Sequence, residues 1–185
     1  MNAVDTEELK RVLAAADCLH DASAVQAAIG NLAAAVNAHF RDRRPLVLVV
    51  MNGGLVPAGW LLPKFDFLFE LDYLHATRYR GNTVGDELEW LARPRKPLRD
   101  RDVLLVDDIL DEGVTLRALV DFCREQGASS VRSAVLVQKR IGRPAAVDAD
   151  FVGLAVENRY VFGCGMDYKE HFRHLPAIYA LGNGK

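Results

Sequence analysis

The chain is poor in cysteine, in long apolar runs and in net charge, and each shortage excludes a class of protein. Cys18, Cys123 and Cys164 are too scattered for a disulfide framework or a CxxC metal site. No stretch approaches the roughly 20 apolar residues of a membrane span. The formal net charge of -2 gives no broad attraction to nucleic acid or anionic lipid. The opening residues also lack the basic and then apolar order of a secretory signal, so we expect a cytoplasmic protein without nucleic-acid or membrane partners.

Two common phosphate-binding motifs are missing as well. Neither GxxxxGK[ST] nor GxGxxG occurs, so a nucleoside triphosphatase or a dinucleotide enzyme would lack its phosphate cradle.

Of the 185 residues, 50% are hydrophobic, which suits one globular domain with a substantial core. Strand-like runs alternate with helix-like runs, which predicts an α/β fold with a largely parallel central sheet flanked by helices.

Helical periodicity dominates the N-terminal part of the chain. One helix is expected to begin at Asp5, where Glu8 completes a capping-box pattern, and a second one at Ser23. The run 46–51 then reads as a buried strand that leads into a glycine turn and a short helix. Later apolar runs predict further strands over 131–137, 151–156 and 177–181.

The most informative segment follows a strand expected to begin at Val103. This apolar run reads as buried on both faces, and Asp107 and Asp108 stand at its carboxyl end, before a turn containing Gly113 and a helix from Thr115. Ligands of α/β sheets bind outside the carboxyl ends of strands, and the amides of a helix N-terminus favour a phosphate. Carboxylates beside a phosphate would repel it unless they hold a divalent cation, bind sugar hydroxyls, or both.

Simpler readings of this segment remain open from the residues alone. Adjacent acids after a strand can cap a helix or face solvent. An EF-hand is excluded, because Ile109 occupies a ligand position. A phosphoacceptor signalling domain is disfavoured, since its acidic pair should follow an early strand and its phosphorylated aspartate should end another.

The element nevertheless resembles the phosphoribosyl diphosphate (PRPP) signature of type I phosphoribosyltransferases. The resemblance covers roughly residues 46–181 and is most similar to the hypoxanthine-guanine phosphoribosyltransferases. Its further motifs are Gly53-Gly54, Arg78-Tyr79, Val137-Gln138-Lys139-Arg140, and the segment from Tyr160 to Asp167 with Arg173 beyond. It implies a single domain, 1–185, with N-terminal helices (1–44), a PRPP-binding core (45–140) with a flap at about 78–92, and C-terminal purine-binding and hood segments (141–185).

The resemblance also implies how PRPP is held. Asp107 and Asp108 would contact the ribose hydroxyls and Mg2+, and Asp111 would act as general acid/base at the purine N7. The 5'-phosphate loop would consist of Asp111, Glu112, Gly113, Val114 and Thr115. Pyrophosphate would be bound by Asn52, Gly53, Gly54 and Arg173, with a backbone amide of the glycine turn exposed through an unusual cis peptide.

Four residues would hold the purine in this interpretation. Lys139 would hydrogen-bond the purine O6, Tyr160 would stack on the ring, and the Val161 backbone would read the purine edge. Asp167 would lie at the same edge and help to bind a second Mg2+. A lysine at O6 favours a 6-oxopurine over adenine. Without the resemblance, Lys139 could be an ordinary strand-end lysine and Tyr160 a core aromatic.

Three positions depart from the family pattern. Asn52 stands where many members have a lysine, so pyrophosphate would lack a cation there. Glu112 replaces a small hydroxyl residue, and because an ionised carboxylate cannot donate to phosphate we expect its side chain to point away. Arg78 stands in the flap where a serine is common, and we hypothesise that it supplies the missing positive charge.

The implied activity is purine salvage: transfer of the 5-phosphoribosyl group from PRPP to hypoxanthine or guanine, which gives IMP or GMP and pyrophosphate. The family also implies a homo-oligomer, either a dimer or a tetramer. The alternative is a PRPP-sensing regulator with the same fold and no catalysis. The chain has no added helix-turn-helix segment or basic excess that such a regulator would use on nucleic acid.

Overall fold

The computed structural model describes residues 5–78 and 88–182. Within them, the larger sheet has six strands in the order β4-β3-β2-β5-β6-β7, and every neighbouring pair except β3–β4 is parallel. Its strands are β2 (Leu46–Val50), β3 (Glu70–Arg78), β4 (Leu88–Ala92), β5 (Asp102–Leu110), β6 (Ser130–Arg140) and β7 (Phe151–Glu157). The predicted α/β fold with a largely parallel central sheet is confirmed.

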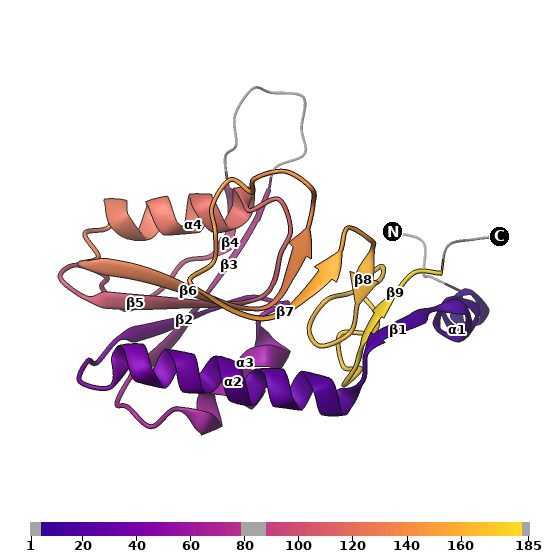
Figure 1. The fold of residues 1–185 in the computed structure, drawn as a ribbon. Coiled ribbons are helices and arrows are strands. Elements are labelled where there is room, and N and C mark those ends of the chain that lie inside the picture. Colours follow the sequence, from indigo (N-terminus) through magenta and orange to yellow (C-terminus); the bar gives the residue numbers. More distant parts are fainter. Residues whose placement is uncertain (1–4, 79–87, 183–185) are drawn as a thin grey trace.

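Helices cover both faces of this sheet (Figure 1). They are α2 (Ala22–Phe40), α3 (Leu55–Leu61) with the 3-10 turn η1 (Leu62–Lys64), and α4 (Val114–Glu125). Helix α1 (Thr6–Ala15) lies apart from this sheet (Figure 1). Figure 1 shows α4 on one face and α2 and α3 on the other. None of the helices within the described ranges is long and apolar enough to cross a bilayer.

A smaller sheet lies beside the larger one. It consists of β1 (Asp17–His20), β8 (Val161–Phe162) and β9 (Ile178–Ala180), in the order β1-β9-β8. We call this sheet, together with residues 159–177 that lead through β8 to β9, the hood. The sequence did not predict β1, because its residues have no apolar alternation and it pairs with β9 mainly through backbone atoms. The apolar run near residue 178 correctly predicted a strand, and that strand joins the hood.

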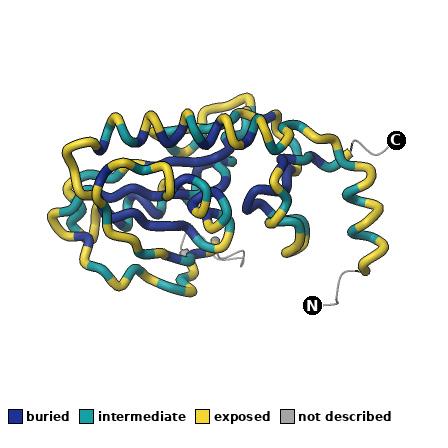
Figure 2. Tube along the Cα trace, turned by 90° about the horizontal axis from the view of Figure 1, so that it is seen from below, coloured by how far each residue is buried: buried dark blue, intermediate teal, exposed yellow. Residues whose placement is uncertain are grey.

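The core is divided into two layers by the larger sheet. One layer packs the apolar face of α2, including Ile29, Val36 and Phe40, against the sheet, and the other packs Leu116 and Leu119 of α4. All five residues of β2 are buried. Figure 2 shows the buried residues concentrated along the strands between exposed helix faces. Two buried faces explain why these strands are continuous apolar runs.

The first helix starts at Asp5 as predicted, whereas the second starts before the predicted Ser23. The second helix begins after Asp21, whose carboxylate accepts the Ala24 N–H at 2.8 Å, and Ser23 already lies inside it. In the first helix the Asp5 carboxylate accepts from the N–H of Glu7, at the second helical position. Both ends still use an aspartate N-cap, which satisfies an otherwise unpaired amide.

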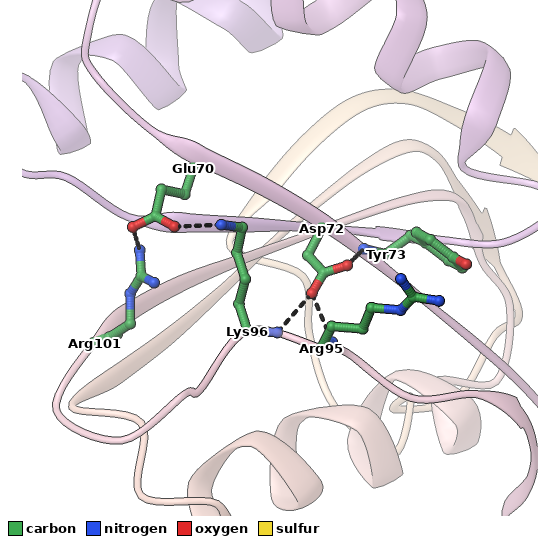
Figure 3. Close-up of polar contacts among 6 residues, drawn as sticks. All are labelled: Glu70, Asp72, Tyr73, Arg95, Lys96 and Arg101. Atoms are coloured by element: carbon green, nitrogen blue, oxygen red, sulfur yellow. Dashed lines mark hydrogen bonds and ion pairs between the residues drawn. The ribbon is translucent and has the colours of Figure 1, made fainter.

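The antiparallel pair β3–β4 is the base of the predicted flap. Residues 79–87, and so Tyr79, lie outside the described residues. The Asp72 carboxylate of β3 accepts backbone N–H groups of Arg95 (2.7 Å) and Lys96 (2.9 Å), as Figure 3 shows. Burial opposes ionisation of Asp72, but these bonds and that from Tyr73 outweigh it and lower the pKa of the carboxyl. Beside it, Glu70 pairs with Lys96 and with Arg101 (Figure 3).

Candidate functional site

A cavity of about 560 Å3 opens at the carboxyl edge of the larger sheet. Parallel strands end at the same edge, so the ends of β2, β3 and β5 meet there with the start of α4. Its lining includes these predicted site residues: Asn52, Gly53, Asp107, Asp108, Asp111, Glu112, Gly113, Val114, Thr115 and Arg173. The fold therefore brings together residues that are up to about 120 positions apart in the chain.

The two adjacent carboxylates lie within β5, which continues to Leu110 because it stays paired with β6. The sequence had placed them at the end of the strand. Asp108 is buried, with 8% exposure, and Asp107 is partly buried. Burial raises the pKa of both carboxyls, and the Asp108 charge raises that of Asp107 further; Arg173 opposes the rise at Asp108. Such a pair favours binding of a cation, which would stabilise both charged forms.

The turn after β2 packs directly on Asp108. A Cβ at Gly53 would overlap the Asp108 carboxylate, and one at Gly54 would lie 2.6 Å from two backbone carbonyl oxygens of β2 and β5. Only glycine fits at these positions. The peptide bond between Met51 and Asn52 is cis, so the cis peptide expected at this turn lies just before Gly53.

The loop formed by residues 111–115 leads from β5 into α4. Gly113 has a φ of 79° and is the N-cap of the 12-residue helix. The first amides of a helix lack intrahelical acceptors and point toward an incoming anion. Thr115 lies in this first turn and lines the cavity. The predicted geometry of an anion-binding helix start is therefore present.

Lys139 reaches the same loop from the end of β6. Its Nζ lies 2.7 Å from Oδ2 of Asp111, and the lysine side chain is 13% exposed. The register of β5 and β6 accounts for this contact, since Leu110 lies opposite Gln138. The structure thus joins the two side chains that were expected at N7 and O6 of a purine.

The remaining predicted purine residues lie in the hood. Tyr160 is half exposed, and its hydroxyl donates to the backbone carbonyl of Asp167 at 3.0 Å. Val161 is buried in β8. The Asp167 carboxylate pairs with Arg173 at 2.7 Å and accepts the N–H of Glu170 at 2.8 Å. Tyr160, Val161 and Asp167 are not part of the cavity lining, and neither are Lys139 and Gly54. Arg173, which lines the cavity, pairs with Asp167.

The hood docks on the core through a second close approach of backbones. A Cβ at Gly165, whose φ is 105°, would overlap the carbonyl oxygen of Gly53. Arg173 secures this contact, because its guanidinium donates to the Gly165 carbonyl at 2.8 Å. Sequence reasoning missed the role of Gly165, although two closely spaced glycines, Gly163 and Gly165, are a signal for a turn or a close backbone approach.

Sequence reasoning also missed lining residues from other elements. His75 and Thr77 come from the carboxyl half of β3, Leu91 from β4 and Glu170 from the hood. The β3 residues could have been inferred, since a parallel neighbour of β2 ends at the same edge. Arg78 is described only as the last residue of β3.

The predicted metal ligands do not form one preformed cluster. In the described part of the chain, no three His, Cys, Asp or Glu side chains gather as they would around a metal ion. Asp107 and Asp108, adjacent on β5, offer the hard oxygen atoms that Mg2+ prefers. Asp167 is engaged by Arg173.

Fold and site together define a class: α/β proteins that bind a phosphorylated ligand between the carboxyl ends of parallel strands and a helix N-terminus. Comparison with known proteins narrows this class. The model of the phosphoribosyl transferase domain matches residues 15–169. The chain therefore belongs to the phosphoribosyltransferase family, as its resemblance predicted.

Individual relatives agree with the family match. The hypoxanthine-guanine phosphoribosyltransferase of Bacillus subtilis is 34% identical over 85% of this chain and 88% of its own length. The bifunctional protein TilS/HprT of Listeria innocua is 36% identical over 83% of this chain, which spans only 24% of that protein. A solved hypoxanthine-guanine-xanthine phosphoribosyltransferase superposes with a TM-score of 0.81 at 30% identity and covers 90% of this chain and 97% of its own.

Proposed function

We propose that this protein is a hypoxanthine-guanine phosphoribosyltransferase of purine salvage. It transfers the 5-phosphoribosyl group of PRPP to hypoxanthine or guanine, which yields IMP or GMP and pyrophosphate. The observation that carries this proposal is the convergence of Asp107, Asp108 and the 111–115 loop on one cavity. The names of the relatives at 30% identity or more support the same activity.

The PRPP half of the site follows from charge and hydrogen-bonding capacity. The amides of the 111–115 loop and the Thr115 hydroxyl bind the 5'-phosphate. Asp107 and Asp108 accept hydrogen bonds from the ribose hydroxyls. Pyrophosphate lies at Asn52, Gly53 and Gly54 and is reached by the Arg173 guanidinium. Arg173 is the one cation in this set, since Asn52 carries no charge.

The purine half lies between the loop and the hood. Lys139 donates to O6, and Asp111, its partner at 2.7 Å, faces N7. Tyr160 stacks on the ring, while the backbone at Val161 and Asp167 reads the 2-position. Lys139, whose side chain is only 13% exposed, would face the amino group of adenine, which is a donor, in place of an acceptor, and this disfavours that base.

Asp111 is the proposed general acid/base. A purine ring nitrogen attacks C1 of PRPP as the C1–pyrophosphate bond breaks, and the Asp111 carboxylate accepts the proton of N7, which leaves the purine of the product neutral. General acid/base catalysis of this kind typically contributes about 100-fold to 10,000-fold. The flap on β3 and β4, with Arg78 and Tyr79 at its start, excludes water that would hydrolyse PRPP.

Magnesium fits the acidic pair of β5. Asp107 and Asp108 would hold Mg2+, directly or through water, because their burial makes both carboxylates unstable without a cation. Asp167 would assist a second ion. When bound, Mg2+ would neutralise charge that develops on the leaving pyrophosphate.

Assembly and location are part of the proposal. The protein works as a homo-oligomer, as the family resemblance implies. It works in the cytoplasm, which its three free cysteines support.

The test is nucleotide formation from PRPP and Mg2+ with hypoxanthine, guanine, xanthine or adenine in separate reactions. We expect product from hypoxanthine and guanine, and at least about 100-fold less from adenine. The rate with xanthine, compared with that with hypoxanthine, measures how the site discriminates at the purine 2-position. Binding of PRPP without product from any base would identify a regulator, and no PRPP binding would overturn the proposal.

A further inference from the structure

The connection between β6 and β7, residues 141–150, packs directly on the 111–115 loop, and we call it the strap. Its Ala146 donates an N–H to the Glu112 carbonyl at 2.8 Å. The Arg117 guanidinium in α4 donates to the Ala146 carbonyl at 3.0 Å. A Cβ on Gly113 would come within 3.0 to 3.2 Å of strap backbone atoms. The strap therefore holds the loop in place through backbone contacts.

Glu112 places an acidic side chain in this loop. An ionised carboxylate cannot donate to a phosphate, and its charge repels a phosphate nearby. In the structure, Glu112 Oε1 lies 2.5 Å from Nη2 of Arg143 in the strap. The adjacent acid, Asp111, pairs with Lys139 at the end of β6. The two acidic side chains of the loop thus each pair with a cation, one at the end of β6 and one in the strap that follows it.

We propose that Arg143 is a positioning residue for PRPP: it holds the Glu112 carboxylate against the strap and neutralises its charge where the 5'-phosphate binds. This inference rests on the proposed function and adds a residue that the family resemblance did not supply. Arg143 takes no part in the bond changes at C1. Its effect is expected in the affinity for PRPP, because the phosphate is present in both the ground state and the transition state.

The test compares Arg143→Ala, Glu112→Gln and the double variant in steady-state kinetics with hypoxanthine as the base. We expect Arg143→Ala to raise the KM for PRPP about threefold to tenfold at low salt, with kcat and the KM for hypoxanthine within about twofold of wild type. Glu112→Gln removes the repelling charge and keeps the loop amide, so its KM for PRPP should fall well below that of Arg143→Ala. The double variant should behave like Glu112→Gln.

Two further measurements separate charge from structure. Raising the ionic strength from about 0.05 M to about 0.5 M should reduce the Arg143→Ala defect, because salt screens an exposed carboxylate. Arg143→Lys keeps the charge and should stay within about twofold of wild type. It also serves if Arg143→Ala does not fold.

The other end of α4 offers a matched control. Arg124 and Asp121 form an ion pair whose side chains are 63% and 46% exposed, close to the 65% and 44% of Arg143 and Glu112. Arg124→Ala removes the same charge from the molecule but lies far from the loop along the helix. Its KM for PRPP should match that of wild type within about twofold.

Three outcomes would overturn the inference while wild type stays active. They are an unchanged KM for PRPP in Arg143→Ala, a rise in Glu112→Gln as large as that in Arg143→Ala, and a double variant that is not restored. Failure of the proposed function itself is distinct: wild type would neither form nucleotide nor bind PRPP in calorimetry.

Discussion

The glycine turn after β2 gives the sharpest structural prediction. Gly53→Ala adds a methyl group where the Asp108 carboxylate already lies, and Asp108 is only 8% exposed, so neither side can move aside freely. Overpacking of this kind costs about 1 to 3 kcal/mol of unfolding free energy. For a chain of this size, Tm should fall by about 2 to 10 °C. Displacement of the turn should also lower kcat/KM for PRPP by about 100-fold.

The control is Gly30→Ala in the middle of α2, where an added Cβ meets no atom within 4 Å. Alanine is the better helix former by about 1 kcal/mol, so this variant should be slightly more stable and fully active. Urea denaturation and steady-state kinetics on both variants provide the assay. A Gly53→Ala protein as stable and as active as wild type would refute the packing of this turn on Asp108.

Three other substitutions test separate parts of the account. Asp111→Asn should lower kcat by about 100-fold to 10,000-fold with PRPP binding largely retained, and an unchanged kcat would remove Asp111 from proton transfer. Lys139→Gln should lower kcat/KM for hypoxanthine by about tenfold to 100-fold and reduce the preference for hypoxanthine over adenine. If competition assays showed the same preference for hypoxanthine as in wild type, a contact of Lys139 with O6 would be excluded. Asp72→Asn should cost about 1 kcal/mol at neutral pH in urea titrations. Because the folded-state pKa of Asp72 is lowered, its stabilisation is present above the ordinary value of 3.8 and is lost as pH falls below it, so the cost should shrink in acid; a cost independent of pH would contradict the hydrogen bonds at Asp72.

The central strand and its loop could be predicted because local chemistry determines them. A short apolar run from Val103 that is followed by turn residues is typical of a strand buried on both faces. Gly113 then permits the positive φ that starts α4. These features depend on neighbours in sequence, which a single chain displays directly.

Contacts between distant segments could not be predicted in the same way. The edge strand β1 is defined by its backbone pairing with β9, and its side chains show no pattern that is typical of a strand. The approach of Gly165 to Gly53 and the pairing of Arg143 with Glu112 both depend on how the C-terminal half packs on the core. The residue types indicate which side chains can form such contacts, but only the tertiary structure determines which pairs of residues meet.

A crystal structure with PRPP and Mg2+ tests the central claim most directly. We expect a phosphoryl oxygen of the 5'-phosphate within about 2.7 to 3.2 Å of the Thr115 hydroxyl and of loop amides. We also expect the ribose hydroxyls or the metal at Asp107 and Asp108. A PRPP molecule bound elsewhere, or a 5'-phosphate remote from Thr115 with both aspartates uninvolved, would contradict it.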